Sequence, residues 1–173
     1  MKQIILMRHA KSSWDDPALD DFDRPLGRRG RLAASLMGAW LAERNPAPDH
    51  VLLSGAARTA ETWARAARVL GDVSAPVVSD RRLYMAAPET MLEVLRALPD
   101  DAATVLLIGH QPSLGSLARL LSAESAVPEH CRQAFSHFPT AAAAVLESPV
   151  SAWSELDFGA AAFAQFARPK DLV

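Results

Sequence analysis

Cysteine is nearly absent from this sequence, since Cys131 is the only one in the chain. A single thiol excludes an intrachain disulfide and any site that needs several thiolate ligands. It also fits a reducing compartment. The chemistry of the protein must therefore come from side chains other than cysteine.

Long apolar runs are absent as well. No stretch of the sequence approaches the length needed to span a membrane. The apolar segment that follows Met1 is short and runs directly into Arg8 and His9, which is not the design of a signal peptide. We expect a soluble, cytoplasmic protein with no membrane partner.

An excess of charge of one sign is also lacking. The chain has 18 Lys and Arg residues against 20 Asp and Glu residues, which gives a formal net charge of -2. Without a basic excess, nothing in the overall charge indicates a nucleic-acid partner. Any site that binds an anion must therefore be local.

Apolar residues, by contrast, make up 50% of the 173 positions. This is enough material for one well-packed domain and leaves little for a second. The sequence shows no internal repeat, no low-complexity linker and no break in composition. We expect residues 1–173 to form a single domain.

Short apolar runs alternate along the chain with segments of helical spacing. The runs that predict strands are residues 3–7, 50–55, 75–80, 104–109, 141–147 and 160–167. The segments that predict helices are residues 30–44, 57–71, 88–98 and the leucine-spaced segment from 114 to 121. In the first helix, Leu32, Leu36 and Trp40 recur four apart and form the expected apolar face. Residues 123–140 predict an irregular excursion.

This alternation has a consequence for the fold. Strands that alternate with helices of this length imply right-handed crossovers and a mainly parallel sheet that is covered on both faces. The last two strands have no helix between them, which favours antiparallel pairing at an edge. The sequence therefore predicts an α/β fold, a three-layer α/β/α sandwich with a mainly parallel central sheet of about six strands and an antiparallel C-terminal edge.

Ionisable side chains follow three of the predicted strands. In chain order they are Arg8, His9, Arg58 and His110. Ligands of open parallel sheets bind beyond the carboxyl ends of the strands, so topology brings these two arginines and two histidines to one rim. Arginine grips phosphate oxygens bidentately and stays charged. The four residues together predict a phosphate pocket, whereas Arg8 and His9 alone could simply be a strand end that reaches solvent.

Two neighbours of these four residues have open roles. Ser54 is a possible cap of the helix that starts near Ala57, and that helix would direct its free N–H groups at the same rim. Gln111 follows His110, where it could contact phosphate or only begin a turn. The chain offers no convincing carboxylate cluster for a metal, so we expect neither a metal nor another cofactor.

Three segments of the sequence carry a family resemblance. They are "RHA" after the first strand, "SGAARTAET" at residues 54–62 and "GHQPSL" after a later strand. Together they resemble the histidine phosphatase superfamily, also called phosphoglycerate-mutase-like, over residues 3 to about 122. The "RPL" at 24–26, the "RLY" at 82–84 and the small size look most like the SixA-type phosphohistidine phosphatases. One departure is Ala10, where the family usually has glycine.

The resemblance implies a role for each of these residues. His9 would attack phosphorus and form a phosphohistidine intermediate that water later hydrolyses, for which its ring must be neutral. Arg8, Arg58 and His110 would hold the phosphoryl oxygens, and Ser54 and Gln111 are further candidate contacts. This describes a metal-independent phosphoric monoester or phosphohistidine hydrolase, whose partner is a phosphorylated substrate such as a phosphohistidine protein.

The acid that many family members supply as a proton donor has no clear counterpart here. The matching stretch offers Tyr84 and then Glu89. Asp15, Asp16 and Asp23 are substitute donors if their loop folds over the site, and otherwise they form a solvated acidic loop. A phosphoramidate needs less help with its leaving group than a phosphomonoester does, which favours a phosphohistidine substrate.

Two other functions fit the same residues. The first is a phosphomutase acting on small metabolites, which would need a proton donor and a lid that this chain lacks in sequence. The second is a non-catalytic module that binds a phosphorylated ligand. A basic cluster, Arg28, Arg29 and Arg31, enters the first helix. It is either a solvated face or a surface for an acidic partner protein or a phosphorylated substrate.

Overall fold

One six-stranded sheet forms the centre of this computed structural model, which describes residues 1–173. In chain order the strands are β1 (Lys2–Arg8), β2 (His50–Leu53), β3 (Val77–Ser79), β4 (Thr104–Gly109), β5 (Ala143–Ser148) and β6 (Ala162–Ala167). Their order across the sheet is β3-β2-β4-β1-β5-β6. The first four of these are mutually parallel, whereas β5 is antiparallel to both β1 and β6. The predicted mixed sheet with an antiparallel C-terminal edge is confirmed.

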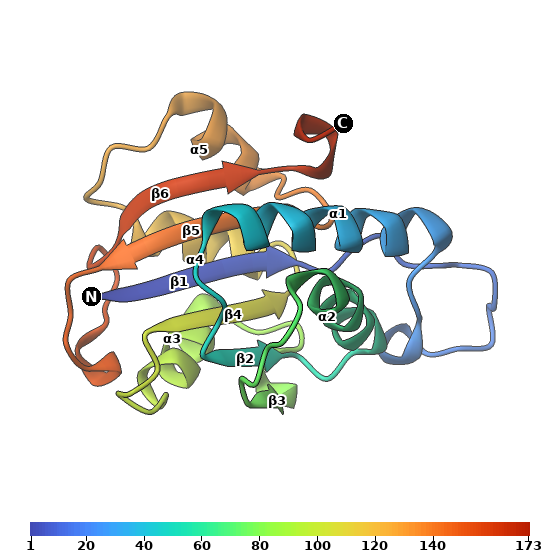
Figure 1. Ribbon diagram of the computed structural model, residues 1–173, viewed down its shortest axis with the longest axis horizontal. Helices are drawn as coiled ribbons and strands as arrows, with labels where there is room; N and C mark the ends of the chain where they lie inside the picture. The colour runs from blue at the N-terminus through green and yellow to red at the C-terminus, as the bar shows by residue number, and fades with distance from the viewer.

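Helices cover both faces of this sheet. They are α1 (Arg28–Arg44), α2 (Ala57–Leu70), α3 (Pro88–Arg96), α4 (Ser113–Leu121) and α5 (Glu129–Ser136). Figure 1 shows α1 and α2 in front of the sheet, with α3 and α4 behind it. Short 3-10 helices complete the chain: η1 (Asp21–Asp23), η2 (Arg81–Leu83), η3 (Trp153–Glu155) and η4 (Pro169–Asp171). None of the helices combines the length and the hydrophobicity that a transmembrane span requires.

Strand β1 shows why the sheet needs two helical layers. Its side chains alternate between the two faces. Ile4 and Leu6 belong to the core beneath α3 and α4, whereas Ile5 and Met7 belong to the core beneath α1 and α2. All four side chains are at most 1% exposed. A continuous apolar run is therefore the pattern of a strand that is buried on both faces.

The segment 123–140 corrects one prediction, because it contains helix α5 rather than only irregular chain. Cys131 and Phe135 stand four residues apart and are both buried. Phe135 belongs to the core on the α4 side of the sheet. The two prolines of the segment, Pro128 and Pro139, lie just outside the helix. They therefore restrict its length but do not interrupt its hydrogen bonds.

The apolar face of α1 is a second correction. Leu32 is 66% exposed, although its spacing from Trp40 places both on one predicted face. Of the three predicted residues, only Trp40 is buried. The other buried residues of the helix are small, or they directly follow a predicted position: Gly30, Ala34, Met37, Gly38 and Leu41. Small residues allow α1 to approach its neighbours closely, and a search for large apolar side chains alone overlooks them.

Candidate active site

The pairing of β1 with β4 brings the two histidines together. The strands are parallel and in register, so that Arg8 at the end of β1 stands opposite Gly109 at the end of β4. His9 and His110 are the next residues along each strand, and their ring centroids lie 5.1 Å apart. Residues separated by about a hundred positions in sequence thus meet at the carboxyl edge of the sheet, as predicted.

The His9 ring has one nitrogen committed to the backbone. Its Nδ1 lies 2.7 Å from the carbonyl oxygen of Ala10. A carbonyl only accepts hydrogen bonds, so in the neutral ring Nδ1 carries the proton and Nε2 carries the free lone pair. Burial above all, with the nearby charges of Arg58 and Arg8, lowers the pKa of His9 to about 3. The ring is therefore a neutral base with one nitrogen available.

The His110 ring takes part in a chain of hydrogen bonds. Arg58 can only donate, and its Nη2 lies 3.4 Å from His110 Nδ1, so that Nδ1 accepts and Nε2 carries the proton. Nε2 then donates to Ser54 Oγ over 2.7 Å. The chain continues to the Thr59 hydroxyl, which donates to the Ala56 carbonyl. Burial, followed by the charge of Arg58, lowers the pKa of His110 to about 4.

Arg58 is held from its other side by Asp21 of η1. Its guanidinium donates to the Asp21 backbone oxygen over 2.6 Å and to the Asp21 carboxylate over 2.9 Å. The Tyr84 hydroxyl donates to the same carboxylate. The hydrogen bond from Tyr84, together with Arg58, lowers the pKa of Asp21. A charged carboxylate therefore lies at the edge of the site, paired with Arg58.

These side chains surround a cavity of about 420 Å³. Its lining consists of Arg8, His9, Lys11, Ser12, Trp14, Asp21, Arg24, Arg58, Met85, His110, Gln111 and Thr140. Four of these residues are Lys or Arg, and one is acidic. The apolar members, Trp14 and Met85, are 76% and 64% exposed and form a rim. The cavity therefore suits a small, highly charged anion with an attached group that can reach the rim.

Known proteins resemble the chain in sequence and in structure. The family model of the histidine phosphatase superfamily (branch 1) matches residues 4–84. An uncharacterized protein of Mycobacterium tuberculosis is 38% identical over 95% of this chain and all of its own length. A Nakamurella multipartitia structure that carries the name of the phosphohistidine phosphatase SixA superposes with a TM-score of 0.84 and is 33% identical, over 97% of this chain and 96% of its own.

The chain belongs to the histidine phosphatase superfamily. A further structure, of the protein histidine phosphatase SixA complexed with tungstate, superposes with a TM-score of 0.77 and is 26% identical, over 99% of each chain. The family and these neighbours support a phosphatase activity. They also place this chain on the SixA-like side of the superfamily.

The predictions for Ser54 and Gln111, the two residues next to the candidate site, have mixed outcomes. Ser54 is not the cap of α2, because Ala56 holds that position and no side chain caps the helix. Ser54 supports His110 instead. The Gln111 side chain reaches the cavity wall, but its amide bonds the Phe135 and Ser136 carbonyls and the Gly115 N–H. Gln111 thus ties α4 to α5.

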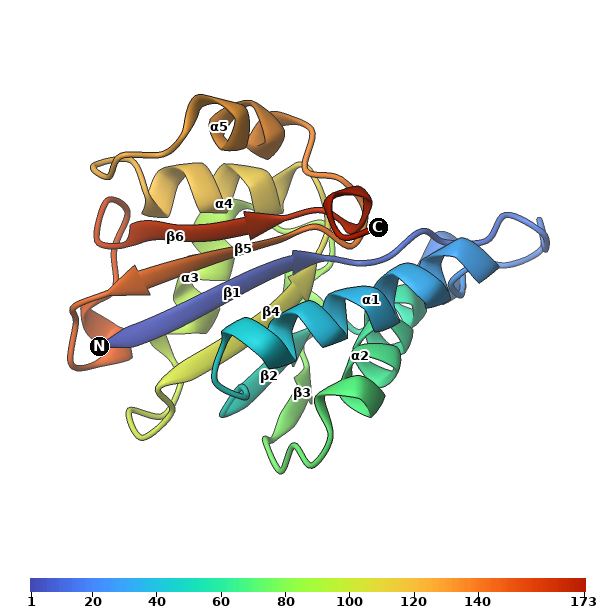
Figure 2. The same cartoon turned by 45° about the horizontal axis from the view of Figure 1, so that its top comes forward.

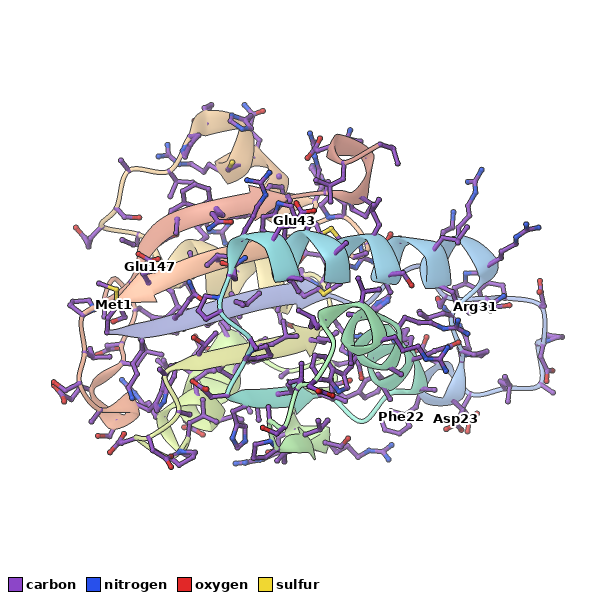
Figure 3. The ribbon with its side chains drawn as sticks, viewed as in Figure 1. Met1, Phe22, Asp23, Arg31, Glu43 and Glu147 are labelled. Atoms are coloured by element: carbon purple, nitrogen blue, oxygen red, sulfur yellow. The ribbon has the colours of Figure 1, made fainter.

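The carboxylate of the site is one that the sequence analysis did not single out. Asp15, Asp16 and Asp23 are exposed and line no part of the cavity; Figure 3 shows Asp23 at the outer edge of the molecule. Asp21 lines the cavity instead, because the 3-10 turn that carries it packs against α2. Its position three residues before Arg24, the first residue of the "RPL" segment, is the signal that could have identified it.

Arg24 is a second residue that sequence reasoning missed. It is buried, and its guanidinium contacts Ser12, Asp21 and the face of Trp14, whose ring centroid lies 3.3 Å away. It therefore fixes the loop after β1 against η1. Ala10, the residue that replaces the usual glycine, is fully buried and donates its N–H to Thr62 Oγ1. No group of three or more His, Cys, Asp or Glu side chains is arranged to hold a metal ion.

Proposed function

We propose that this protein is a phosphohistidine phosphatase that acts on a phosphorylated protein through a phosphoenzyme at His9. The observation that carries the proposal is the state of the His9 ring. Its Nδ1 proton is bound to the Ala10 carbonyl, so Nε2 holds a lone pair directed away from that bond. With its pKa lowered to about 3, the ring is a nucleophile at neutral pH.

The surrounding residues have roles in the proposed reaction. Arg8 and Arg58 bind the phosphoryl oxygens, and the charge that spreads over these oxygens in the transition state strengthens both contacts. His110 is neutral in the free protein, and an arriving phosphoryl dianion raises its pKa and favours its cationic form. In the first half of the reaction, His9 Nε2 attacks the phosphorus atom and the N–P bond of the substrate breaks, its electron pair leaving with the substrate imidazole. In the second half, water attacks the phosphorus atom, the electron pair of the His9 N–P bond returns to Nε2, and the phosphate leaves with the protons of the water.

The substrate class follows from the acids that surround the site. Asp21 is the one carboxylate in the cavity lining, and its lowered pKa makes it a poor proton donor at neutral pH. The imidazole of a phosphohistidine leaves as a neutral ring when its other nitrogen is protonated, whereas an alcohol has to receive a proton. A site of this kind therefore favours phosphohistidine over phosphomonoesters. The tungstate complex of the related SixA supports the binding of a tetrahedral oxyanion in such a fold.

Rapid-quench labelling with a radioactive phosphoryl donor tests the covalent step. We expect base-stable, acid-labile phosphate on the wild-type protein and none on His9→Ala. His137→Ala, which replaces an exposed histidine outside the cavity, is the matched control and should label normally. Absence of label on the wild-type protein with several donors would instead favour a module that binds a phosphorylated ligand without turnover.

A comparison of substrates tests the specificity. The kcat/KM for a phosphohistidine peptide should exceed the values for small phosphomonoesters. Faster cleavage of several phosphomonoesters than of any phosphohistidine peptide would exclude the proposed substrate class. Phosphoryl transfer between small phosphorylated metabolites at a useful rate would show a phosphomutase instead.

A further inference from the structure

A second cavity adjoins the proposed phosphoryl site. Its volume is about 290 Å³, and we call it the basic groove. The groove is lined by Lys11, Arg29, Ala33, Pro139, Thr140, Arg168, Pro169 and Lys170. Lys11 and Thr140 also line the cavity that holds His9, so the two cavities are direct neighbours. A molecule bound at His9 can therefore extend into the groove.

The cations of the basic groove come from three separate segments. Lys11 follows β1, Arg29 lies in the first turn of α1, and Lys170 lies in η4 after β6. Figures 1 and 2 show the C-terminal coil beside α1, and the two elements are in contact. Figure 3 labels Arg31 at the same end of α1. The positive charges therefore come together only in the folded chain.

Three of the four cations that line the groove lack an ion-pair partner. Lys11, Arg29 and Lys170 are exposed and form no ion pair, whereas Arg168 is paired with Asp171 at 2.9 Å. No acidic residue lines the groove. The concentration of like charge contrasts with the net charge of -2 for the whole chain. These cations attract anions, and they repel one another when no anion is bound.

The start of α1 points to the same conclusion. The N-terminal end of a helix carries partial positive charge and is stabilised by acidic residues. The first turn of α1 has none, its Gly27 N-cap offers no side-chain hydrogen bond, and Arg28, Arg29 and Arg31 stand there instead. Positive side chains next to the partial positive charge of the helix end destabilise α1. A bound anion would reduce this electrostatic repulsion.

We propose that the basic groove binds acidic side chains of the protein that carries the phosphohistidine. This inference rests on the proposed function. Arg29 and Lys170 do not line the cavity of His9, so they do not serve the phosphoryl group itself. Their charges are spread over separate segments, which fits carboxylates that are distributed along an extended polypeptide at about 3.3 Å per residue. Lys11 stands between the phosphoryl site and these outer cations.

Two phosphohistidine peptides test the proposal. They are identical except that one has glutamate and the other glutamine on both sides of the phosphohistidine. At low salt we expect the wild-type kcat/KM to be about 5- to 10-fold higher for the glutamate peptide, with the difference in KM rather than kcat. The ratio should fall to about 1 in Arg29→Ala/Lys170→Ala. Arg28→Ala, which removes an exposed arginine of the same turn outside the groove, should keep it.

Charge reversal provides a second measure. Arg29→Glu/Lys170→Glu should prefer the glutamine peptide, an inversion that a merely structural effect would not produce. Raising the ionic strength should reduce the wild-type preference because exposed charges are screened. Equal kcat/KM for the two peptides in the wild-type protein, or a preference that survives charge reversal, would overturn the groove as the site for acidic residues.

Failure of the proposed function would be seen separately. If neither peptide is hydrolysed, the phosphohistidine phosphatase proposal fails, and fluorescence anisotropy of the same labelled peptides then tests the groove. Tighter binding of the glutamate peptide to wild type than to Arg29→Ala/Lys170→Ala supports the groove as an acidic-peptide site. Equal binding of both peptides to both proteins contradicts it.

Discussion

His9 and His110 owe their neutral state chiefly to burial. The two residues are 7% and 4% exposed, and the cost of placing a charged ring in this environment lowers both pKa values. Arg58 adds to the effect in each case. The same environment that favours a neutral nucleophile therefore makes the protein sensitive to acid.

The stability of the protein should fall as the pH is lowered from 7 to 5. An unfolded histidine has a pKa of about 6.5, so below this pH the unfolded chain binds more protons than the folded one. For two rings with folded pKa values of about 3 and 4, the free energy of unfolding falls by on the order of 4 kcal/mol over this interval. Urea denaturation at pH 7 and pH 5 measures it.

Variants identify the source of this pH dependence. His9→Asn or His110→Asn should each remove roughly half of it, whereas His137→Asn at an exposed position is the control. If the difference between pH 7 and pH 5 were the same in His9→Asn and wild type, His9 would not be the source of the linkage.

Asp21 should weaken the binding of phosphate to the free enzyme. Its carboxylate lies 2.9 Å from Arg58, where it competes with an incoming anion and repels it. In Asp21→Asn, an amide of the same shape lacks the charge, so we expect the inhibition constant for inorganic phosphate to fall ~3- to 10-fold. Inhibition kinetics measure this change.

Asp23→Asn is the matched control, because Asp23 lies in the same 3-10 turn but forms no ion pair and does not line the cavity. Weaker phosphate inhibition in Asp21→Asn would contradict the prediction. It would show instead that Asp21 acts mainly by positioning Arg58.

At the scale of elements, close contact between helices holds the site in shape. Gly38 of α1 lies against the backbone of Ala66 in α2, the helix that carries Arg58. Gly115 of α4 lies in the same way against the Phe135 carbonyl of α5. In both pairs, the missing side chain lets two backbones approach each other. The small residues of α1 that the apolar pattern overlooked thus determine its packing.

Gly38→Ala should destabilise the protein by about 1–3 kcal/mol. A methyl group there would stand 2.7 Å from the Ala66 carbonyl oxygen, which is too close for either backbone to tolerate without moving. This cost outweighs the gain of about 1 kcal/mol in helix propensity. Urea denaturation provides the measurement. Gly27→Ala, where the nearest atom is 3.8 Å away, is the control, and a more stable Gly38→Ala would refute the predicted clash.

At the scale of the whole molecule, the strands of the sheet differ in how deeply they are buried. Every residue of β4 is buried, and β4 lies between β2 and β1. Every residue of β3, at one edge, is exposed. The two histidines of the candidate site therefore follow the two central strands, β1 and β4, and lie away from the exposed edge strand β3.

Hydrogen exchange should reflect this arrangement. We expect the amides of β4 and the middle of β1 to exchange slowest, at rates set by global unfolding, because their hydrogen bonds open only when the core does. Those of β3 should exchange much faster through local opening. Native-state exchange measured by NMR tests the order. Protection of β3 equal to that of β4 would indicate that the edge is covered in solution.

Much of this arrangement was predictable from particular residues. The apolar runs of β1 and β4, each ending in an ionisable pair or in Gly109–His110, indicated buried parallel strands with chemistry at their carboxyl ends. Helix α5 was missed because the prolines on either side of it suggested irregular chain and because it has few apolar residues. Asp21 was missed because, on a loop with several aspartates, composition does not distinguish the one whose carboxylate meets Arg58.

The amino-acid sequence by itself determined the alternation of strands and helices, the mixed sheet and the four residues at its rim. These depend on local periodicity and on the general geometry of parallel sheets. Only the tertiary structure decided which carboxylate meets Arg58, which nitrogen of His9 is free and which cations form the basic groove. Each of these depends on distances between segments that are remote in the chain, and such distances are set by the packing of the whole fold.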